Sequence, residues 1–421
     1  MFQNLRLEIW KNIHSLPLGF IRFWQLRALQ SLARHAYLHT GLYHDLWDKN
    51  GIGPSQLKHL SDLQRFPVIN KKTFLNAPVE SYIGLIKQQF YIWRYTSGTG
   101  GQPFPFTSIN GIHSPYANFL RYRFLYWERI PPSIIQKKMP MVRISSAEIK
   151  RITYQANIDI PLTEFLTNPK KIIKELVHLQ PIVIESYPSV LVEIAQAAIE
   201  FSQFQKLGIQ YAISYGENLK SWQRKFIEDT LECEVIDRYG IAETGVIATE
   251  CRYHDSFHLN TESFILEIVD TNGASLPSGK TGRIIITDLR NYVMPFIRYD
   301  IGDQGRFLPG HCPCGLEGER FVVNGREGEF LALGSAKVHH LEFDKVMDSF
   351  SGAIIQYQVA KIDEHAVTLF IICGPAMTEF ILNHIREKMQ ALIGTDCRLN
   401  IEFVTKIKRA PRGKCQTLIS T

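Results

Sequence analysis

The chain has little that would place it in a membrane or outside the cell. A membrane span needs about 20 mostly apolar residues, and the longest candidate, residues 16–43, is interrupted by Arg22, Arg27 and Arg34. Its apolar positions recur at helical spacing, which predicts an amphipathic helix. The start lacks a signal-peptide core, and the seven cysteines favour reduced thiols. We therefore expect a cytoplasmic protein without a transmembrane segment.

The sequence also lacks low-complexity segments, repeats of fixed period and a continuous basic stripe. We therefore expect no repeat architecture, and no disorder except at the ends of the chain. The net charge of +6 comes from scattered lysines and arginines, a distribution that argues against nucleic-acid binding. What is present is an ordinary globular composition, 45% hydrophobic and 21% charged, over 421 residues. That length predicts two or three domains.

The middle of the chain has the rhythm of an α/β sheet. Short apolar runs alternate with helical patterns, which predicts a mostly parallel sheet. The expected strands are 181–185, 210–214 and 234–237, and the expected helices are 189–204 and 219–231. Another strand, 89–95, leads into a glycine-rich segment.

The character of the sequence changes after residue 255. Residues 264–269 and 282–287 predict antiparallel strands around a turn at Asn272-Gly273. The tail predicts a compact α+β module with strands at 353–359, 366–373 and 398–404 and a helix at 378–393. We expect a large domain, 1–325, and a small mobile domain, 326–421.

A glycine-rich segment carries the strongest single motif. Its glycines let the backbone approach a ligand closely, and its hydroxyls and amides can donate to phosphate oxygens. No Gly-Lys-Ser/Thr follows, so it is not a Walker A loop. A plain loop is the alternative. The candidate phosphate-binding residues are Thr96, Ser97, Gly98, Thr99, Gly100 and Gly101.

A second motif, residues 237–244, follows the expected strand 234–237, and we expect Gly240 to break the chain at the strand's end. Ligands of open α/β sheets bind at the carboxyl ends of strands. Tyr239 could stack on a base, and Glu243 could hold Mg²⁺, which prefers oxygen ligands. A simple Tyr-Gly turn is the alternative.

Three charged residues further along the chain follow these two motifs. A Gly302-Asp303 turn would present Asp303 to solvent, where its carboxylate could accept hydrogen bonds from both ribose hydroxyls. Arg326 lies at the expected domain boundary. Lys414 is flanked by glycine near the end of the chain and could bring a point charge to a reacting phosphate. A turn aspartate and a solvated basic tail are the alternatives.

The ordered series resembles the adenylate-forming superfamily of acyl-CoA synthetases, and more closely its phenylacetate–CoA ligase branch. The resemblance spans roughly residues 90 to 420. It implies that the glycine-rich loop holds the ATP phosphates and that Gly325-Arg326 is a hinge. The remaining roles that it implies are Tyr239 near adenine, Gly216-Glu217 at the adenine edge, Glu243 on Mg²⁺, Asp303 on the ribose and Lys414 as the catalytic lysine.

The sequence departs from the family pattern in three places. Asn218 replaces the proline after Gly216-Glu217. The phosphate loop reads Gly-Thr-Gly-Gly where Gly-Thr-Thr-Gly is commoner, which removes one hydroxyl. The hinge arginine is followed by Glu327-Gly328-Glu329, which leaves the identity of the acidic pivot open.

Four residues could form a zinc site. Cys251, His258, Cys312 and Cys314 offer three thiols and one imidazole, which make a closed tetrahedral site. Buried or surface thiols are the alternative. Members of the same branch show a similar pattern, and four protein ligands imply a structural role for Zn²⁺.

The resemblance implies ATP-dependent activation of a small aryl or acyl acid to an acyl-adenylate. Transfer to a thiol would follow, either coenzyme A or the phosphopantetheine of a carrier protein, in a monomer or homodimer. An amine or alcohol acceptor is one alternative. A degenerate nucleotide- or zinc-binding scaffold in a biosynthetic complex is another.

Overall fold

The structure is a computed structural model, and it divides into two compact units that each combine two segments of the chain. The first unit contains residues 1–130 and 238–327, and the second contains residues 131–237 and 328–421. The described residues are 13–84, 91–96, 103–109, 123, 141–146, 151–153, 157–201, 208–326, 328, 330–333, 336–410 and 413–420.

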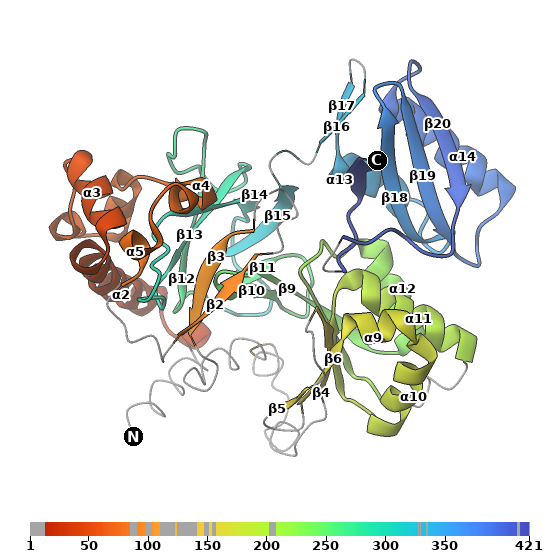
Figure 1. Ribbon diagram of the computed structural model, residues 1–421, viewed down its shortest axis with the longest axis horizontal. Helices are drawn as coiled ribbons and strands as arrows, with labels where there is room; N and C mark the ends of the chain where they lie inside the picture. The colour runs from red at the N-terminus through yellow and green to blue at the C-terminus, as the bar shows by residue number, and fades with distance from the viewer. Residues whose placement is uncertain are drawn as a thin grey trace. The chain divides into compact units, whose positions relative to one another are not determined.

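The first unit begins with helices, and α2 and α3, red in Figure 1, lie side by side. One face of α2 is buried at Ile21, Leu29 and Leu32, as the amphipathic pattern predicts. The elements of this segment are η1 (Ile13–Ser15), α2 (Leu18–His39), α3 (Gly41–Lys49), η2 (Pro54–Gln56), η3 (Leu60–Arg65), β1 (Ile69–Asn70), α4 (Lys71–Leu75), α5 (Val79–Tyr82), β2 (Tyr91–Tyr95) and β3 (Pro105–Ile109).

The second segment of this unit is antiparallel. Its order is β12-β13-β14-β15-β11-β10-β9, and β1 joins β14 in parallel. The predicted hairpin is confirmed, because Phe264 to Val269 pairs with Asp288 to Arg283. The strands are β9 (Glu234–Ile241), which enters from the other unit, β10 (Gly245–Glu250), β11 (Phe257–Leu259), β12 (Phe264–Val269), β13 (Gly282–Asp288), β14 (Tyr299–Phe307) and β15 (Arg320–Arg326).

The second unit contains the predicted parallel sheet. Strands β6, β4, β7 and β8 pair in parallel, and β5 adds an antiparallel edge. The apolar side chains of β4, β6, β7 and β8 form one core with α9, α10 and α11. The elements are β4 (Met141–Ser145), β5 (Arg151–Thr153), β6 (Asn157–Pro161), α9 (Leu162–Thr167), α10 (Pro169–Leu179), β7 (Val183–Ser186), α11 (Pro188–Phe201), β8 (Tyr211–Tyr215) and α12 (Ser221–Leu231).

The tail forms the predicted α+β module within the second unit. Its sheet has the order β20-β19-β18-β21, and α14 lies along it (Figure 1). Trp222 of α12 packs into the core of this module. The elements are β16 (Phe330–Leu333), β17 (Ala336–His339), α13 (His340–Asp348), β18 (Ile354–Asp363), β19 (Ala366–Cys373), α14 (Glu379–Ile393), β20 (Arg398–Phe403) and β21 (Leu418–Ser420).

Two local expectations are wrong. Gly240 does not end a strand, because β9 continues to Ile241. A Cβ atom on Gly240 would lie 2.3 Å from the carbonyl oxygen of Gly245, so glycine is required there by the close approach of β10. Asp303 does not lie in a solvent-facing turn, because it sits inside β14 and is only 7% exposed. Strand pairing with Arg326 holds it inward.

Within the residues that the structure describes, no helix is both long and apolar enough to cross a membrane. The two structural units do not coincide with residues 1–325 and 326–421, because residues 131–237 group with the C-terminal module. The functional division into a large domain and a mobile small domain stays a prediction.

Candidate active site and Cys/His cluster

The first unit brings three of the expected residues together around one carboxylate. The Tyr239 hydroxyl donates to Asp303 Oδ2 at 2.6 Å, and Arg326 Nε donates to Oδ1 at 3.2 Å. Burial, and then the Asp303 charge, raise the pKa of Tyr239 well above its usual value. The phenol therefore stays protonated and serves as a donor. Asp303 is thus a fixed acceptor at the meeting point of β9, β14 and β15.

The positive charge of Arg326 also acts on Glu243. The Tyr299 hydroxyl donates to Glu243 Oε1 at 3.3 Å. Burial raises the pKa of Glu243, while hydrogen bonds and the charges of Arg326 and Lys71 lower it. Burial followed by the charge of Glu243 raises the pKa of Tyr299. Burial makes the charged form of Glu243 unfavourable, and a bound cation would stabilise that form.

The described ends of the glycine-rich loop meet at one point. Thr96 N–H donates to the Phe104 carbonyl at 3.0 Å, and Thr96 Oγ1 accepts from Phe104 N–H at 3.0 Å. Tyr95 and Pro105 are paired across β2 and β3. The loop therefore leaves and re-enters a hairpin. Residues Ser97, Gly98, Thr99, Gly100 and Gly101 lie outside the described part of the chain.

The second unit holds the other expected group. Gly216 has φ of +78°, and a Cβ added to it would lie 3.5 Å from Lys414 Nζ. Lys414 Nζ also lies 5.7 Å from the centre of the Tyr187 ring. Glu217, next to Gly216, accepts a hydrogen bond of 2.6 Å from the Cys415 N–H. The catalytic lysine candidate therefore lies beside the segment expected at the adenine edge.

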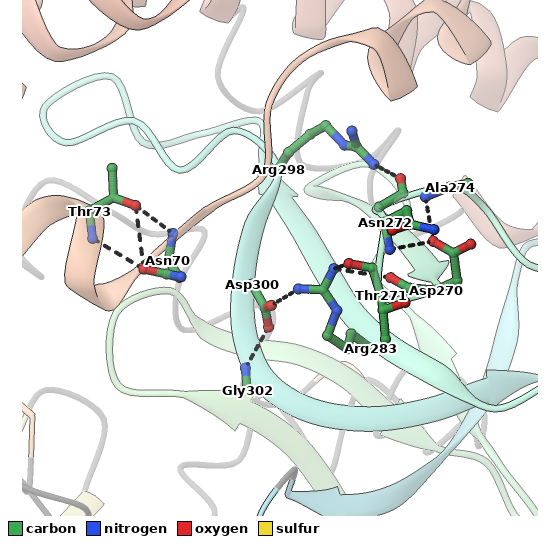
Figure 2. A network of polar contacts seen from close by, with 11 residues as sticks. Asn70, Thr73, Asp270, Thr271, Asn272, Ala274, Arg283, Arg298, Asp300 and Gly302 are labelled. Atoms are coloured by element: carbon green, nitrogen blue, oxygen red, sulfur yellow. Dashed lines mark hydrogen bonds and ion pairs between the residues drawn. The ribbon is translucent and has the colours of Figure 1, made fainter.

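The strand that carries Asp303 is fixed by a polar network (Figure 2). Arg283 Nη1 donates to Asp300 Oδ2 at 2.6 Å, and its Nη2 donates to the carbonyl of Asp270 at 3.0 Å. Asp300 Oδ1 accepts from Gly302 N–H at 2.9 Å, directly before Asp303. Figure 2 shows Arg283 between β14 and the turn after β12. These bonds hold the backbone on which the Asp303 carboxylate stands.

The four expected metal ligands converge. Their ligand atoms all lie within 4.8 Å of one another. Cys251 Sγ and Cys312 Sγ are 3.7 Å apart, and Cys314 Sγ is 3.5 Å from His258 Nε2. A tetrahedral zinc ion would set these separations at about 3.8 Å and about 3.6 Å. The arrangement of donors therefore fits Zn²⁺.

The electrostatics of this cluster also suit a cation. Burial lowers the pKa of His258 to about 4, which keeps the imidazole neutral and able to bind a metal. Burial raises the pKa values of Cys251 and Cys314. A bound metal ion would reverse that effect, since it stabilises thiolates directly.

Comparisons with known proteins agree with this geometry. No family model matches the chain. A phenylacetate–coenzyme A ligase of Pseudomonas putida is 23% identical, with 99% of this chain and 98% of that protein covered. One from Escherichia coli K12 is 24% identical, with 85% and 82% covered. A crystal structure of 2-hydroxyisobutyryl-CoA ligase in the postadenylation state has a TM-score of 0.80 at 18% identity, covering 97% of this chain and 91% of that chain.

The chain is similar over almost its whole length to phenylacetate–CoA ligases, and it has the fold of the solved 2-hydroxyisobutyryl-CoA ligase. An anthranilate CoA ligase in complex with anthranoyl-AMP has the same fold at a TM-score of 0.54, with 16% identity and 84% of this chain and 73% of that chain covered. The resemblance drawn from the motifs is therefore confirmed. The roles of the individual residues remain predictions.

Sequence reasoning missed several residues of this ligase-fold chain. Tyr299 donates a hydrogen bond to Glu243. Its position four residues before Asp303 in the sequence was the only signal that could have identified it. Arg409 donates to the Gly413 carbonyl beside Lys414, and Ser189 contacts both Arg409 and Glu217. No sequence signal linked Ser189 to this segment, because more than 200 positions separate them in the chain.

Proposed function

We propose that the protein activates a small carboxylic acid, aryl or acyl, with ATP and transfers the acyl group to the thiol of coenzyme A. The ligase fold over almost the whole chain carries this proposal, together with the buried Tyr239–Asp303–Arg326 arrangement. Relatives of this fold are named as CoA ligases. An oxygen of the substrate carboxylate attacks the α-phosphorus of ATP and pyrophosphate leaves. The thiol then attacks the acyl carbonyl and AMP leaves.

We assign the nucleotide contacts residue by residue. Asp303, whose oxygens are held by Tyr239 and Arg326, accepts hydrogen bonds from the ribose hydroxyls. Tyr239 and the backbone of Gly216 flank the adenine, and Thr96 anchors the phosphate loop. Glu243 would hold Mg²⁺, which supplies positive charge to the phosphates.

Lys414 would bring a positive charge to the reacting phosphate. Negative charge accumulates as pyrophosphate separates from the α-phosphate, and a fixed cation stabilises that transition state. The flexible four-carbon stem of a lysine suits a group that must approach and withdraw. We propose that the Gly325-Arg326 hinge lets the small domain withdraw Lys414 before the thiol arrives.

The test is a pyrophosphate-release assay with ATP, Mg²⁺ and a panel of aryl and small aliphatic acids. We expect release that requires one acid class, and a thioester when coenzyme A is added. Supplying a phosphopantetheinylated carrier protein, an amine or an alcohol in place of coenzyme A identifies the acceptor. Failure of every acid to release pyrophosphate above the rate without acid would contradict the proposed function.

We also propose that Cys251, His258, Cys312 and Cys314 hold a structural Zn²⁺ ion. Four protein donors leave no position for a substrate, so the ion would act by joining the loop between β14 and β15 to β10 and β11. Ligation by thiolates requires reduced cysteines, which agrees with the proposed cytoplasmic location.

Zinc removal should destabilise the protein. We expect about one zinc per chain by metal analysis, and a lower melting temperature after treatment with a strong chelator, because metal binding contributes to folding free energy. Cys312→Ser should lose the metal, while Cys373→Ser, at an exposed cysteine, should keep it. If the protein after chelator treatment contains no metal and has the same melting temperature as the protein as purified, the proposed structural site is excluded.

A further inference from the structure

A carboxylate ties the loop of the candidate catalytic lysine to the neighbouring helix. Glu217 follows β8 and accepts three hydrogen bonds. The Cys415 N–H donates at 2.6 Å, the Ser189 N–H at 3.1 Å and the Ser189 hydroxyl at 3.0 Å. The Cys415 nitrogen belongs to the peptide group that joins Lys414 to Cys415. Glu217 therefore fixes the backbone at the point from which the Lys414 side chain starts.

A second set of bonds closes the segment 409–415, here called the lysine hairpin. Arg409 pairs with Cys415 in an isolated β-bridge, and Ala410 N–H donates to the Lys414 carbonyl at 2.8 Å. Arg409 also donates to the Gly413 carbonyl at 2.6 Å and to the Ser189 hydroxyl at 2.9 Å. The same serine hydroxyl thus contacts both Arg409 and Glu217.

Arg409 places a positive charge near two carboxylates, Glu193 and Glu217. Its guanidinium donates to Glu193 at 2.6 Å, and its charge lowers the pKa of Glu217, which burial raises. All three groups that contact Glu217 are donors, so the carboxylate is the form that satisfies them. A glutamine would bring a donor NH₂ group against one of these donors.

We propose that Glu217 is a positioning residue for Lys414, and that its bonds to Ser189 and Cys415 hold the lysine hairpin for the adenylate-forming step. This assignment rests on the proposed function for the identity of the step. It differs from a role at the adenine edge, because the oxygens of Glu217 are occupied by protein donors. The contacts join residues 189–217 to the C-terminal module, so they must break together whenever that module withdraws.

The first test measures the hairpin itself and needs no substrate. In the full-length Glu217→Gln protein, the Cys415 amide loses a charge-assisted hydrogen bond. We expect hydrogen–deuterium exchange in peptides covering 413–417 to be about 10- to 100-fold faster than in the wild type. Glu228→Gln is the matched control, because Glu228 is a carboxylate of the same unit that accepts the Val235 N–H at 3.0 Å. Unchanged exchange at 413–417 in Glu217→Gln would overturn the proposal.

The second test separates positioning from a general loss of structure. With an acid that releases pyrophosphate, Glu217→Gln should slow adenylate formation about tenfold or more, while thioester formation from supplied acyl-adenylate changes less than about twofold. Equal loss in both half-reactions, with a lower melting temperature, would make Glu217 merely structural and refute the proposal. If the wild type releases no pyrophosphate with any acid, the proposed function fails, and the exchange experiment still decides whether Glu217 anchors the hairpin.

Discussion

Replacing Lys414 by alanine should lower the rate of acid-dependent pyrophosphate release by about 100- to 1,000-fold, which is the usual cost of removing one group that stabilises a charged transition state. Lys414 Nζ lies 5.7 Å from the centre of the Tyr187 ring, beside Gly216, where the adenine edge is proposed. The side chain is half-buried, so its charge is less screened than that of a surface lysine. The measurement is single-turnover pyrophosphate release at saturating ATP.

Two controls define this result. Lys408→Ala removes an exposed charge from the same basic run and should leave the rate within about twofold, because its charge is screened by solvent. Thioester formation from supplied acyl-adenylate should persist in Lys414→Ala, since that step does not expel pyrophosphate. Equal rates of pyrophosphate release in wild type and Lys414→Ala would refute the role of the lysine.

The elements of the fold were largely predictable because local patterns and tertiary packing agree. The apolar runs at 264–269 and 282–287 on either side of Asn272-Gly273 predicted a hairpin, and β12 and β13 have that form. In the module after residue 353, the predicted strands at 366–373 and 398–404 and the helix at 378–393 agree with the observed bounds to within one residue. The strand predicted at 353–359 continues to Asp363, and β21 was not predicted. In these segments the local sequence preferences and the tertiary packing favour the same elements.

The errors at Gly240 and Asp303 have a common cause. Glycine and Gly-Asp pairs usually mark turns, and the prediction used that rule. In the structure both positions are inside strands. Gly240 serves packing, whereas Gly302 supplies a positive φ of +82° and has nothing within 4 Å of an added Cβ. A Cβ on Gly240 would collide with Gly245, a residue of the paired strand β10. Such a contact depends on strand register, which single-residue preferences do not specify.

The site was predictable as a set of residue types but not as a set of contacts. Motif order identified Tyr239, Asp303 and Arg326, and the structure shows that they bond to one another. It also shows Glu217 bonded to the backbone beside Lys414, although about 200 positions separate them in the chain. The association of 131–237 with 328–421 that makes this possible has no local signal in the sequence.

Removing the Arg298 side chain should strongly destabilise the first unit. It is only 2% exposed and has a left-handed backbone, with φ of +50°. Its guanidinium donates to the carbonyls of Gln64 at 2.9 Å, Phe66 at 2.6 Å and Gly273 at 2.8 Å. Figure 2 shows it directed to the turn that contains Gly273. It therefore joins the helical segment to the β12–β13 hairpin.

The same guanidinium neutralises Glu267, whose Oε2 accepts from Nε at 3.1 Å. Arg298→Met leaves this buried carboxylate and three carbonyl groups without their donor. We expect the free energy of unfolding to fall by about 3–5 kcal/mol, measured by denaturant unfolding. Lys280→Met, at an exposed position, should change it by less than about 0.5 kcal/mol.

A double variant distinguishes the lost ion pair from the lost packing. Arg298→Met with Glu267→Leu removes both charges, so it should recover part of the stability that Arg298→Met loses. Burial already raises the pKa of Glu267, and loss of Arg298 raises it further. Protonation then relieves the unpaired charge, so the loss in Arg298→Met should shrink as the pH falls from 8 to 5. A loss independent of both pH and the second substitution would assign the effect to the carbonyl contacts alone and contradict a role for the ion pair.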